Sequence, residues 1–367
     1  MATKNYKTKA FATTANKGKK ATKKPIKNKR RTRRNIVLSI FAVITLILIV
    51  FAALIIAKIV EEAKNPNNQQ IPSNENITYI PRDAGNVKMG NLILINSSNP
   101  FDYNINNLIS SSYENLPQGI VNLWSFKNNS ANNTETKIKI DSLNISAPTY
   151  ELASPTLANQ ICLEENTLHA FNQLMLDYCK TLDLSDYSSG SASKINVAWG
   201  WSYEDDLQND LTSYGNAFLN HADGKSITLK LVKAGNEQIT ITEQVLKENF
   251  SWIYENAHKY GFIIRFPDEH KNHTSFDSTE RVHLRYIGVE HATYIFNSNI
   301  CFEEYLGLIR TQHTFDNPLV INSANGKAYS VYYVECSGKD TAIPVPKDSN
   351  YVISGDNMNG FIVTVEK

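Results

Sequence analysis

The chain has 367 residues, 42% of them hydrophobic, so it is long enough to bury one sizeable core and has room for two lobes. Its net charge of +1 hides an asymmetry, because residues 1–34 carry 14 Lys and Arg and no acidic residue. A basic tail of this density can bind nucleic acid. The remainder holds 23 basic and 36 acidic residues, a formal charge of −13, which argues against a nucleic-acid function there.

An uncharged stretch follows the tail at residues 36–57, where Ser39 and Thr45 are the only polar side chains. A helix of that length spans the hydrocarbon layer of a membrane. Because Lys and Arg crowd its N-terminal flank, the positive-inside rule places residues 1–35 in the cytoplasm and the folded part outside. A cleavable signal peptide is the alternative, although its apolar region is normally shorter. We predict a single-pass protein of the cell membrane, whose tail sets the orientation and contacts anionic lipid.

Residues 58–90 are rich in Asn, Pro and Gln and lack an apolar period, which is typical of a flexible stalk. Four cysteines lie in the predicted extracellular part, where disulfides can form. They are Cys162, Cys179, Cys301 and Cys336. Their spacing matches neither a zinc ribbon nor a dense disulfide scaffold, so buried thiols and a single bridge both remain open.

The folded part begins with short apolar runs separated by polar segments. Strands are predicted where apolar residues run together or alternate. A helix is predicted over 164–182, because its apolar residues recur at helical spacing. A polar, acidic segment at 204–210 is also helix-like. The predicted strands of this half lie at 91–96, 136–140, 195–199 and 226–232.

The clearest helix covers residues 242–260, where Thr242 can cap the start and Gly261 can end the last turn. A strand at 262–266 and a helix at about 290–296 follow.

After residue 308, alternating runs separated by Pro, Gly and Asp predict a small β-lobe of about four strands over residues 309–367. Few strands with helices interposed indicate an α+β fold.

The segment 276–288, FDSTERVHLRYIG, contains a carboxylate and an imidazole three residues apart, Glu280 and His283. Such a pair can serve one metal, with the imidazole as a ligand and the carboxylate as base for a metal-bound water. The spacing alone is weak evidence, because it arises by chance in proteins of this size. The flanking residues make it informative.

Five runs of the sequence carry a family resemblance: NLILINSSNPFDY (91–103), WIYENAHKYGFIIRFP (252–267), ERVHLRYIG (280–288), EHATYIF (290–296) and FEEYL (302–306). They are similar to the VanY-type zinc D-Ala-D-Ala carboxypeptidases, which have a helix ending in ENAHKYGF, a strand, and an E-P-W-H-x-R-Y-V-G motif. The resemblance covers about residues 91–308. It implies the small α+β fold, built on an antiparallel sheet, that these peptidases share with the Hedgehog signalling domain.

The resemblance also implies a zinc site. In the family, a His and an Asp come from an S-x-H-x-x-G-x-A-x-D segment, and a second His comes from E-x-x-H. His221 and His283 match the two histidines, and Glu280 matches the general base, with water in the fourth zinc position. The Asp position is Thr228, whose neutral hydroxyl is a poorer zinc ligand than a carboxylate. Asp223, two residues after His221, is either a replacement ligand or a turn carboxylate.

A second departure concerns the family's S-G-Y-R-S segment, whose Arg holds the terminal carboxylate of the substrate. Trp201 occupies that position here, followed by Ser202, and an indole cannot replace a bidentate guanidinium. Arg265 matches another family Arg, for which a substrate-binding and a structural role are both open. His258 and His291 lie on helix faces and are expected to be structural.

Two functions remain open. The departures at Thr228 and Trp201 favour a degenerate relative that keeps the fold and binds peptidoglycan stem peptides or a partner at the cell wall without cutting them, with no need for zinc. The alternative is an active zinc D,D-carboxypeptidase that removes terminal D-Ala from peptidoglycan precursors, with Glu280 acting on a zinc-bound water.

Overall fold

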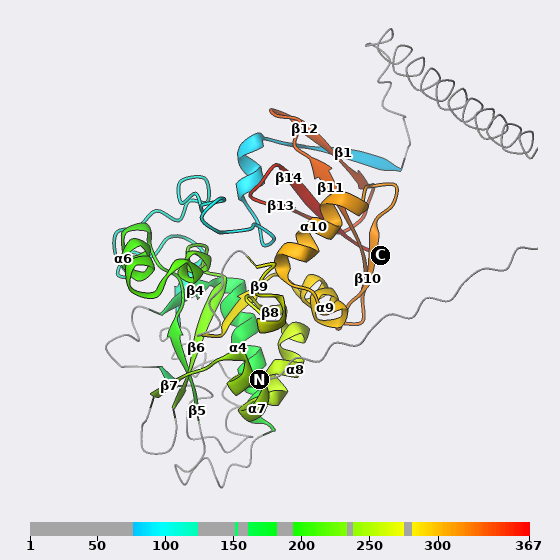
Figure 1. Cartoon of the computed structure of the whole chain (residues 1–367). Helices are drawn as coiled ribbons and strands as arrows, with labels where there is room; N and C mark the ends of the chain where they lie inside the picture. The colour runs from blue at the N-terminus through cyan, green and yellow to red at the C-terminus, as the bar shows by residue number, and fades with distance from the viewer. Residues whose placement is uncertain (1–75, 124–150, 153–160, 182–193, 233–237, 275–280) are drawn as a thin grey trace, which may run out of the picture. The chain divides into compact units, whose positions relative to one another are not determined.

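A computed structural model of the chain describes residues 76–123, 151–152, 161–181, 194–232, 238–274 and 281–367 (Figure 1). These residues belong to one unit, Asn74–Lys367. Within the described ranges, no helix combines the length and the apolar character that crossing a membrane requires. The predicted tail and membrane-spanning helix, residues 1–57, lie outside the described residues and stay predictions. The strand expected at 136–140 also lies outside them.

The larger sheet has six strands in the order β3-β5-β6-β9-β8, with β7 paired to β6 off this path. Its pairings are antiparallel except that of β3 with β5. The strands are β3 (Glu151–Leu152), β5 (Lys194–Trp199), β6 (Ser226–Val232), β7 (Gln238–Thr240), β8 (Phe262–Ile264) and β9 (His283–Tyr286). A separate antiparallel pair joins β2 (Ile120–Asn122) to β4 (Cys162–Glu164). The strands predicted at 195–199, 226–232 and 262–266 are therefore present, the last of them shorter.

Helix α4 (Glu165–Cys179) confirms the helix predicted over 164–182. Glu164 caps it, because its carboxylate accepts a hydrogen bond from the backbone N–H of Thr167 at 2.9 Å. The apolar stripe of α4 is buried in the main core together with residues of β6 and β9. The core includes Leu168, Phe171, Leu174, Met175, Ile227, Leu229 and Leu284.

The helix predicted over 242–260 is interrupted. It consists of α7 (Glu243–Asn249), α8 (Ser251–Asn256) and the 3₁₀ turn η3 (Ala257–Tyr260). Phe250 leaves the helical region at the junction, with φ −136° and ψ 42°, and its side chain is buried in the core. Both predicted ends are confirmed: Thr242 Oγ1 accepts from the Val245 N–H at 3.2 Å, and Gly261 adopts φ +86°.

The remaining helices include those predicted near 204–210 and 290–296. They are η1 (Ala84–Lys88), α6 (Glu204–Tyr214), η2 (Asn216–His221), η4 (Asp268–His270), α9 (Val289–Ser298) and α10 (Phe302–Gln312).

The C-terminal residues form a second antiparallel sheet in the order β10-β11-β14-β13. Its strands are β10 (Leu319–Asn322), β11 (Ala328–Glu335), β13 (Tyr351–Gly355) and β14 (Gly360–Glu366). The fifth C-terminal strand, β12 (Thr341–Pro346), pairs instead with β1 (Ile77–Arg82). Residues 77–88, which composition assigns to a flexible stalk, thus form β1 and η1. Composition does not reveal this, because the partner of β1 lies far along the chain.

Residues 91–96 form no strand, although the apolar run predicts one. Leu92 and Leu94 are buried, but their N–H groups donate to Ser354 Oγ at 2.9 Å and to the Asp356 carbonyl at 3.0 Å. Side chains of α9 and α10 complete the same core, and Figure 1 shows these helices between the two sheets. The core contains Leu92, Leu94, Ile295, Leu306, Ile309, Ile321, Val331 and Ile362. Residues after 308 therefore share a core with residues before it.

Candidate metal and substrate site

Three polar side chains meet beside the larger sheet. His221 ends η2, Thr228 lies in β6 and His283 begins β9. Because the register pairs Thr228 with His283, the two side chains project from the same face of the sheet. The backbone N–H of Gly224 donates to the His221 carbonyl at 3.1 Å, in the turn that returns the chain from His221 to β6. The three side chains are buried, and we call them the His221–Thr228–His283 trio.

The distances within the trio are short. His221 Nε2 lies 3.3 Å from His283 Nδ1. Thr228 Oγ1 lies 2.9 Å from the first nitrogen and 3.1 Å from the second. A tetrahedral zinc ion with Zn–N bonds of about 2.0–2.1 Å holds its nitrogen ligands about 3.3 Å apart. The two imidazoles therefore have the spacing of two ligands of one ion.

The electrostatic environment keeps both imidazoles neutral. Burial lowers the pKa of His221 to about 4 and holds the pKa of His283 well below its usual value. The neighbouring His221, Arg281 and Arg265 lower the pKa of His283 further. Neutral imidazole is the form that binds a metal. The trio thus fits zinc in geometry and protonation, but it lacks the anionic ligand that a carboxylate would provide.

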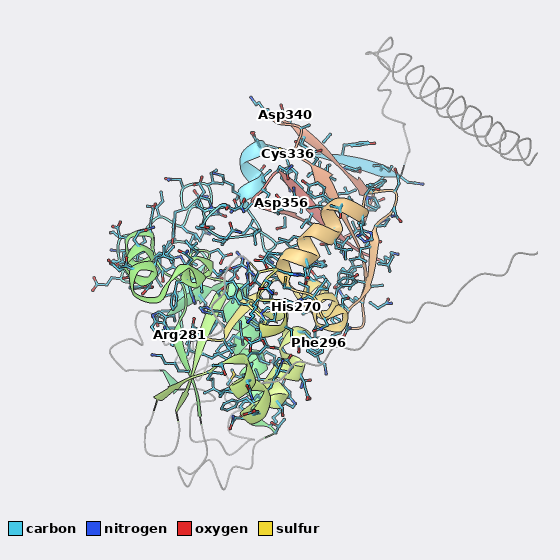
Figure 2. The ribbon with its side chains drawn as sticks, viewed as in Figure 1. His270, Arg281, Phe296, Cys336, Asp340 and Asp356 are labelled. Atoms are coloured by element: carbon cyan, nitrogen blue, oxygen red, sulfur yellow. The ribbon has the colours of Figure 1, made fainter. Side chains whose placement is uncertain are left out.

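Aromatic rings surround the trio. The ring of Phe218 lies 5.1 Å from that of His221 and 5.5 Å from that of His283, measured between centroids. The ring of Phe266 also lies close to that of His283, with 5.7 Å between the centroids. The guanidinium of Arg281, labelled in Figure 2, lies 6.0 Å from the Phe218 ring and adds a positive charge next to the site. In the sequence, the only feature that distinguishes Arg281 is its position directly after Glu280. The family motif has no Arg at that position and therefore does not indicate it.

Asp223 does not join the trio. Its carboxylate forms a bidentate ion pair with Arg285, with Oδ2–Nη2 2.7 Å and Oδ1–Nη1 3.2 Å. Burial raises the pKa of Asp223, but the charges of Arg285 and Lys225 outweigh burial and hold it below the usual value. Of the two alternatives for Asp223, a turn carboxylate or a replacement zinc ligand, this geometry agrees with the turn carboxylate. The interpretation as a replacement ligand is wrong for this geometry.

Arg265 is fully buried and serves the fold. Its two terminal nitrogens donate to the carboxylate of Glu303 in α10 at 2.9 and 2.8 Å. Its Nε donates to Asn220 Oδ1 at 3.0 Å, next to His221. Arg265 therefore links β8 to α10 and supports the segment that carries a trio histidine. These contacts explain its presence without a substrate, and a role in substrate binding stays a prediction.

Trp201 and Ser202 lie next to each other in the chain and are both buried. The indole of Trp201 packs with Ile120 and Cys162, so an apolar group occupies the position that the resemblance assigns to a carboxylate-binding guanidinium. Ser202 Oγ donates to Asp210 Oδ2 at 3.1 Å. Glu280, the predicted base, lies outside the described residues, and its role stays a prediction.

Among the described side chains, Cys162, Cys301 and Cys336 are free thiols, which agrees with the buried-thiol alternative for these three.

The architecture defines the class of protein: an α+β fold of the zinc DD-peptidase type. The chain is similar to a solved structure described as the vancomycin resistance D,D-dipeptidase VanXYg in complex with a D-Ala-D-Ala phosphinate analogue. The TM-score is 0.53, and the match covers 79% of this chain and 99% of that one at 19% sequence identity. At this identity the likeness concerns the fold.

Sequence comparison adds a family likeness. Residues 215–289 match the model of VanY, D-alanyl-D-alanine carboxypeptidase, so this part of the chain is similar to the VanY family. A D-alanyl-D-alanine carboxypeptidase of Enterococcus faecium is 39% identical over 114 residues, 31% of this chain and 35% of the relative. One of Enterococcus faecalis is 42% identical over 59 residues, 16% of this chain and 22% of the relative. The chain thus spans about a third or less of these relatives.

Proposed function

We propose that this protein is a degenerate VanY-family relative that binds peptidoglycan stem peptides ending in D-Ala-D-Ala and does not cleave them. The names of the family and of its enterococcal relatives support this class of ligand. The observation that carries the proposal is the Thr228 hydroxyl within hydrogen-bonding distance of both trio imidazoles, at the position where the family has a carboxylate.

The exchange of a carboxylate for a hydroxyl weakens zinc binding because it removes one negative charge beside a doubly charged ion. The remaining ligands are two neutral nitrogens and a neutral oxygen. Loss of even an outer-shell partner costs a metal site about 10–100-fold in affinity. Without a metal, the Thr228 hydroxyl can donate to one of the two facing imidazole nitrogens and accept from the other, so these three atoms satisfy one another.

Binding without cleavage needs a group for the terminal carboxylate of the peptide. Trp201 cannot supply it, and the guanidinium of Arg265 is engaged by Glu303 and Asn220. Arg281 places a guanidinium 5.0 Å from the ring of Trp199, beside the Phe218 ring that borders both trio histidines. A planar guanidinium suits a carboxylate, so we assign Arg281 to the peptide's C-terminal carboxylate.

The active enzyme is the second candidate, and the 3.3 Å spacing of the two trio nitrogens favours it. His221 and His283 would hold the zinc ion, which would polarise the peptide carbonyl and activate a bound water. Glu280 would take the proton of that water. In either form, the uncharged segment 36–57 and the basic flank before it support a membrane anchor with the folded part outside the cell.

One set of measurements separates the two. Full-length protein in detergent is assayed for zinc content, for affinity toward a pentapeptide stem, and for D-Ala release from that peptide. We expect peptide binding that persists in the presence of a chelator, and no release. Stoichiometric zinc with release that disappears in Glu280→Ala would contradict the degenerate function and support the enzyme. If the protein shows no peptide binding and no D-Ala release, both proposed functions are contradicted.

A further inference from the structure

A second group of metal-ligating side chains lies between the segment that follows β8 and the start of α10. It consists of His270, His273 and Glu304, and we call it the His270–His273–Glu304 cluster. One ligand atom from each residue lies within 4.8 Å of the others. In the described part of the chain, no other three His, Cys, Asp or Glu side chains converge in this way. Figure 2 labels His270 and shows it apart from Arg281, which borders the trio.

The backbone holds the two histidines of the cluster on one side of a turn. The N–H of His270 donates to the Pro267 carbonyl at 3.0 Å, and the N–H groups of His273 and Thr274 donate to the His270 carbonyl at 2.8 and 3.1 Å. On such a helical turn, residues three apart face the same direction. The two imidazole centroids consequently lie 6.3 Å apart.

The third member comes from a different element and is fixed independently. Glu304 is the third residue of α10, and one of its carboxylate oxygens accepts the N–H of Cys301 at 2.8 Å in a capping box. The same carboxylate receives His270 Nδ1 at 2.9 Å on Oε2 and His273 Nδ1 on Oε1. Both imidazoles thus direct the same nitrogen toward a single anionic group.

We propose that His270, His273 and Glu304 form a binding site for a divalent transition-metal ion such as Zn²⁺. Two imidazoles and one carboxylate are an established zinc donor set, with solvent in the fourth position. The cluster has the anionic ligand that the trio lacks. Zinc bonds of about 2.0–2.2 Å place the ligand atoms about 3.3–3.5 Å apart, so the distance from His270 Nδ1 to Glu304 Oε2, now 2.9 Å, would lengthen by about half an ångström.

The cluster can make this adjustment at little cost. The side chain of His273 is 60% exposed, so its ring can rotate without disturbing the core. His270 and Glu304 are less exposed and are held by the turn and by the capping box. A bound ion would fasten the segment that leads from β8 toward Glu280 to the N-terminus of α10. Two N–H···O hydrogen bonds to one carboxylate are the competing explanation of the same geometry.

The test is zinc binding by the full-length protein, measured by calorimetry and by competition with a chromogenic chelator, with Co²⁺ as a spectroscopic probe. We expect His273→Ala to lose one ion that the wild type binds, or to bind it at least 10-fold more weakly. Glu304→Gln keeps the capping acceptor but loses the charge, and should weaken the same ion. His169→Ala is the matched control, because His169 is equally exposed and lies 4.0 Å from the carboxylate of Glu165.

The outcomes are separable from those for the trio. Equal zinc uptake and equal Co²⁺ spectra in the wild type, His273→Ala and Glu304→Gln would overturn the proposal in favour of hydrogen bonding alone. An ion that is lost in His273→Ala and retained in His221→Ala supports the cluster whether or not the trio binds zinc. An ion lost only in His221→Ala would show that the trio is a metal site and the cluster is not.

Discussion

The substitution Thr228→Asp tests the central argument about the trio. It places a carboxylate where a hydroxyl now lies 2.9 and 3.1 Å from the two imidazole nitrogens, which are themselves 3.3 Å apart. The variant therefore gains the anionic third ligand of a catalytic zinc site without moving the other two. Since outer-shell changes already alter zinc affinity about 10–100-fold, we expect a gain of at least about 100-fold, or ~2.7 kcal/mol.

Without metal, the same substitution should lower the stability of the folded protein. A carboxylate in this buried position has no cationic partner within the trio, so we expect the metal-free variant to be less stable than the wild type by a few kcal/mol. Zinc at about 100 times its Kd should restore about 2.7 kcal/mol. Thermal unfolding with and without zinc, together with chelator competition, measures both effects.

Thr228→Asn is the matched control, because it has similar size and no charge. Zinc affinity that is no higher in Thr228→Asp than in Thr228→Asn would refute the reasoning from ligand charge. Wild-type affinity equal to that of Thr228→Asp would show that the hydroxyl suffices.

Three further predictions follow from particular contacts. Asp223→Asn breaks the buried ion pair with Arg285 and should lower the free energy of unfolding by about 3–5 kcal/mol in a urea titration, while the zinc affinity per folded molecule stays unchanged. Burial, aided by Lys259, lowers the pKa of His258 to about 4, so the unfolded chain binds more protons than the folded chain between pH 4 and 6.5. Stability from this group is therefore complete above about pH 6.5 and is lost as the pH falls toward 4, and His258→Gln should flatten that part of the stability–pH curve. Arg281→Ala should weaken binding of a D-Ala-D-Ala peptide about 10–100-fold, whereas a peptide amidated at its C-terminus should bind the wild type and Arg281→Ala alike, as calorimetry can show.

Local patterns in the sequence were sufficient for most elements of the fold. Helix α4, strands β5 and β6, and the caps at Thr242 and Gly261 depend on periodicity and on backbone preferences of nearby residues, which the sequence displays directly. Family motifs indicated His221, Thr228 and His283 as neighbours. Their short mutual distances agree with that prediction.

Long-range contacts decided the rest. The pairing of β1 with β12, and the use of the Leu92 and Leu94 N–H groups by Ser354 and Asp356, join residues more than 250 positions apart, for which no local pattern exists.

The same limit applies to charged side chains. The sequence by itself predicted the α+β fold class, the resemblance to the VanY family, and the residue types at the positions that the resemblance assigns to zinc ligands. Only the tertiary structure showed that Asp223 forms an ion pair with Arg285 and that Arg265 forms one with Glu303. It also showed that Glu304 contacts two histidines from another segment. The reason is physical: the ionic partner of a buried charge is selected by proximity in space, and the folded chain alone establishes that proximity.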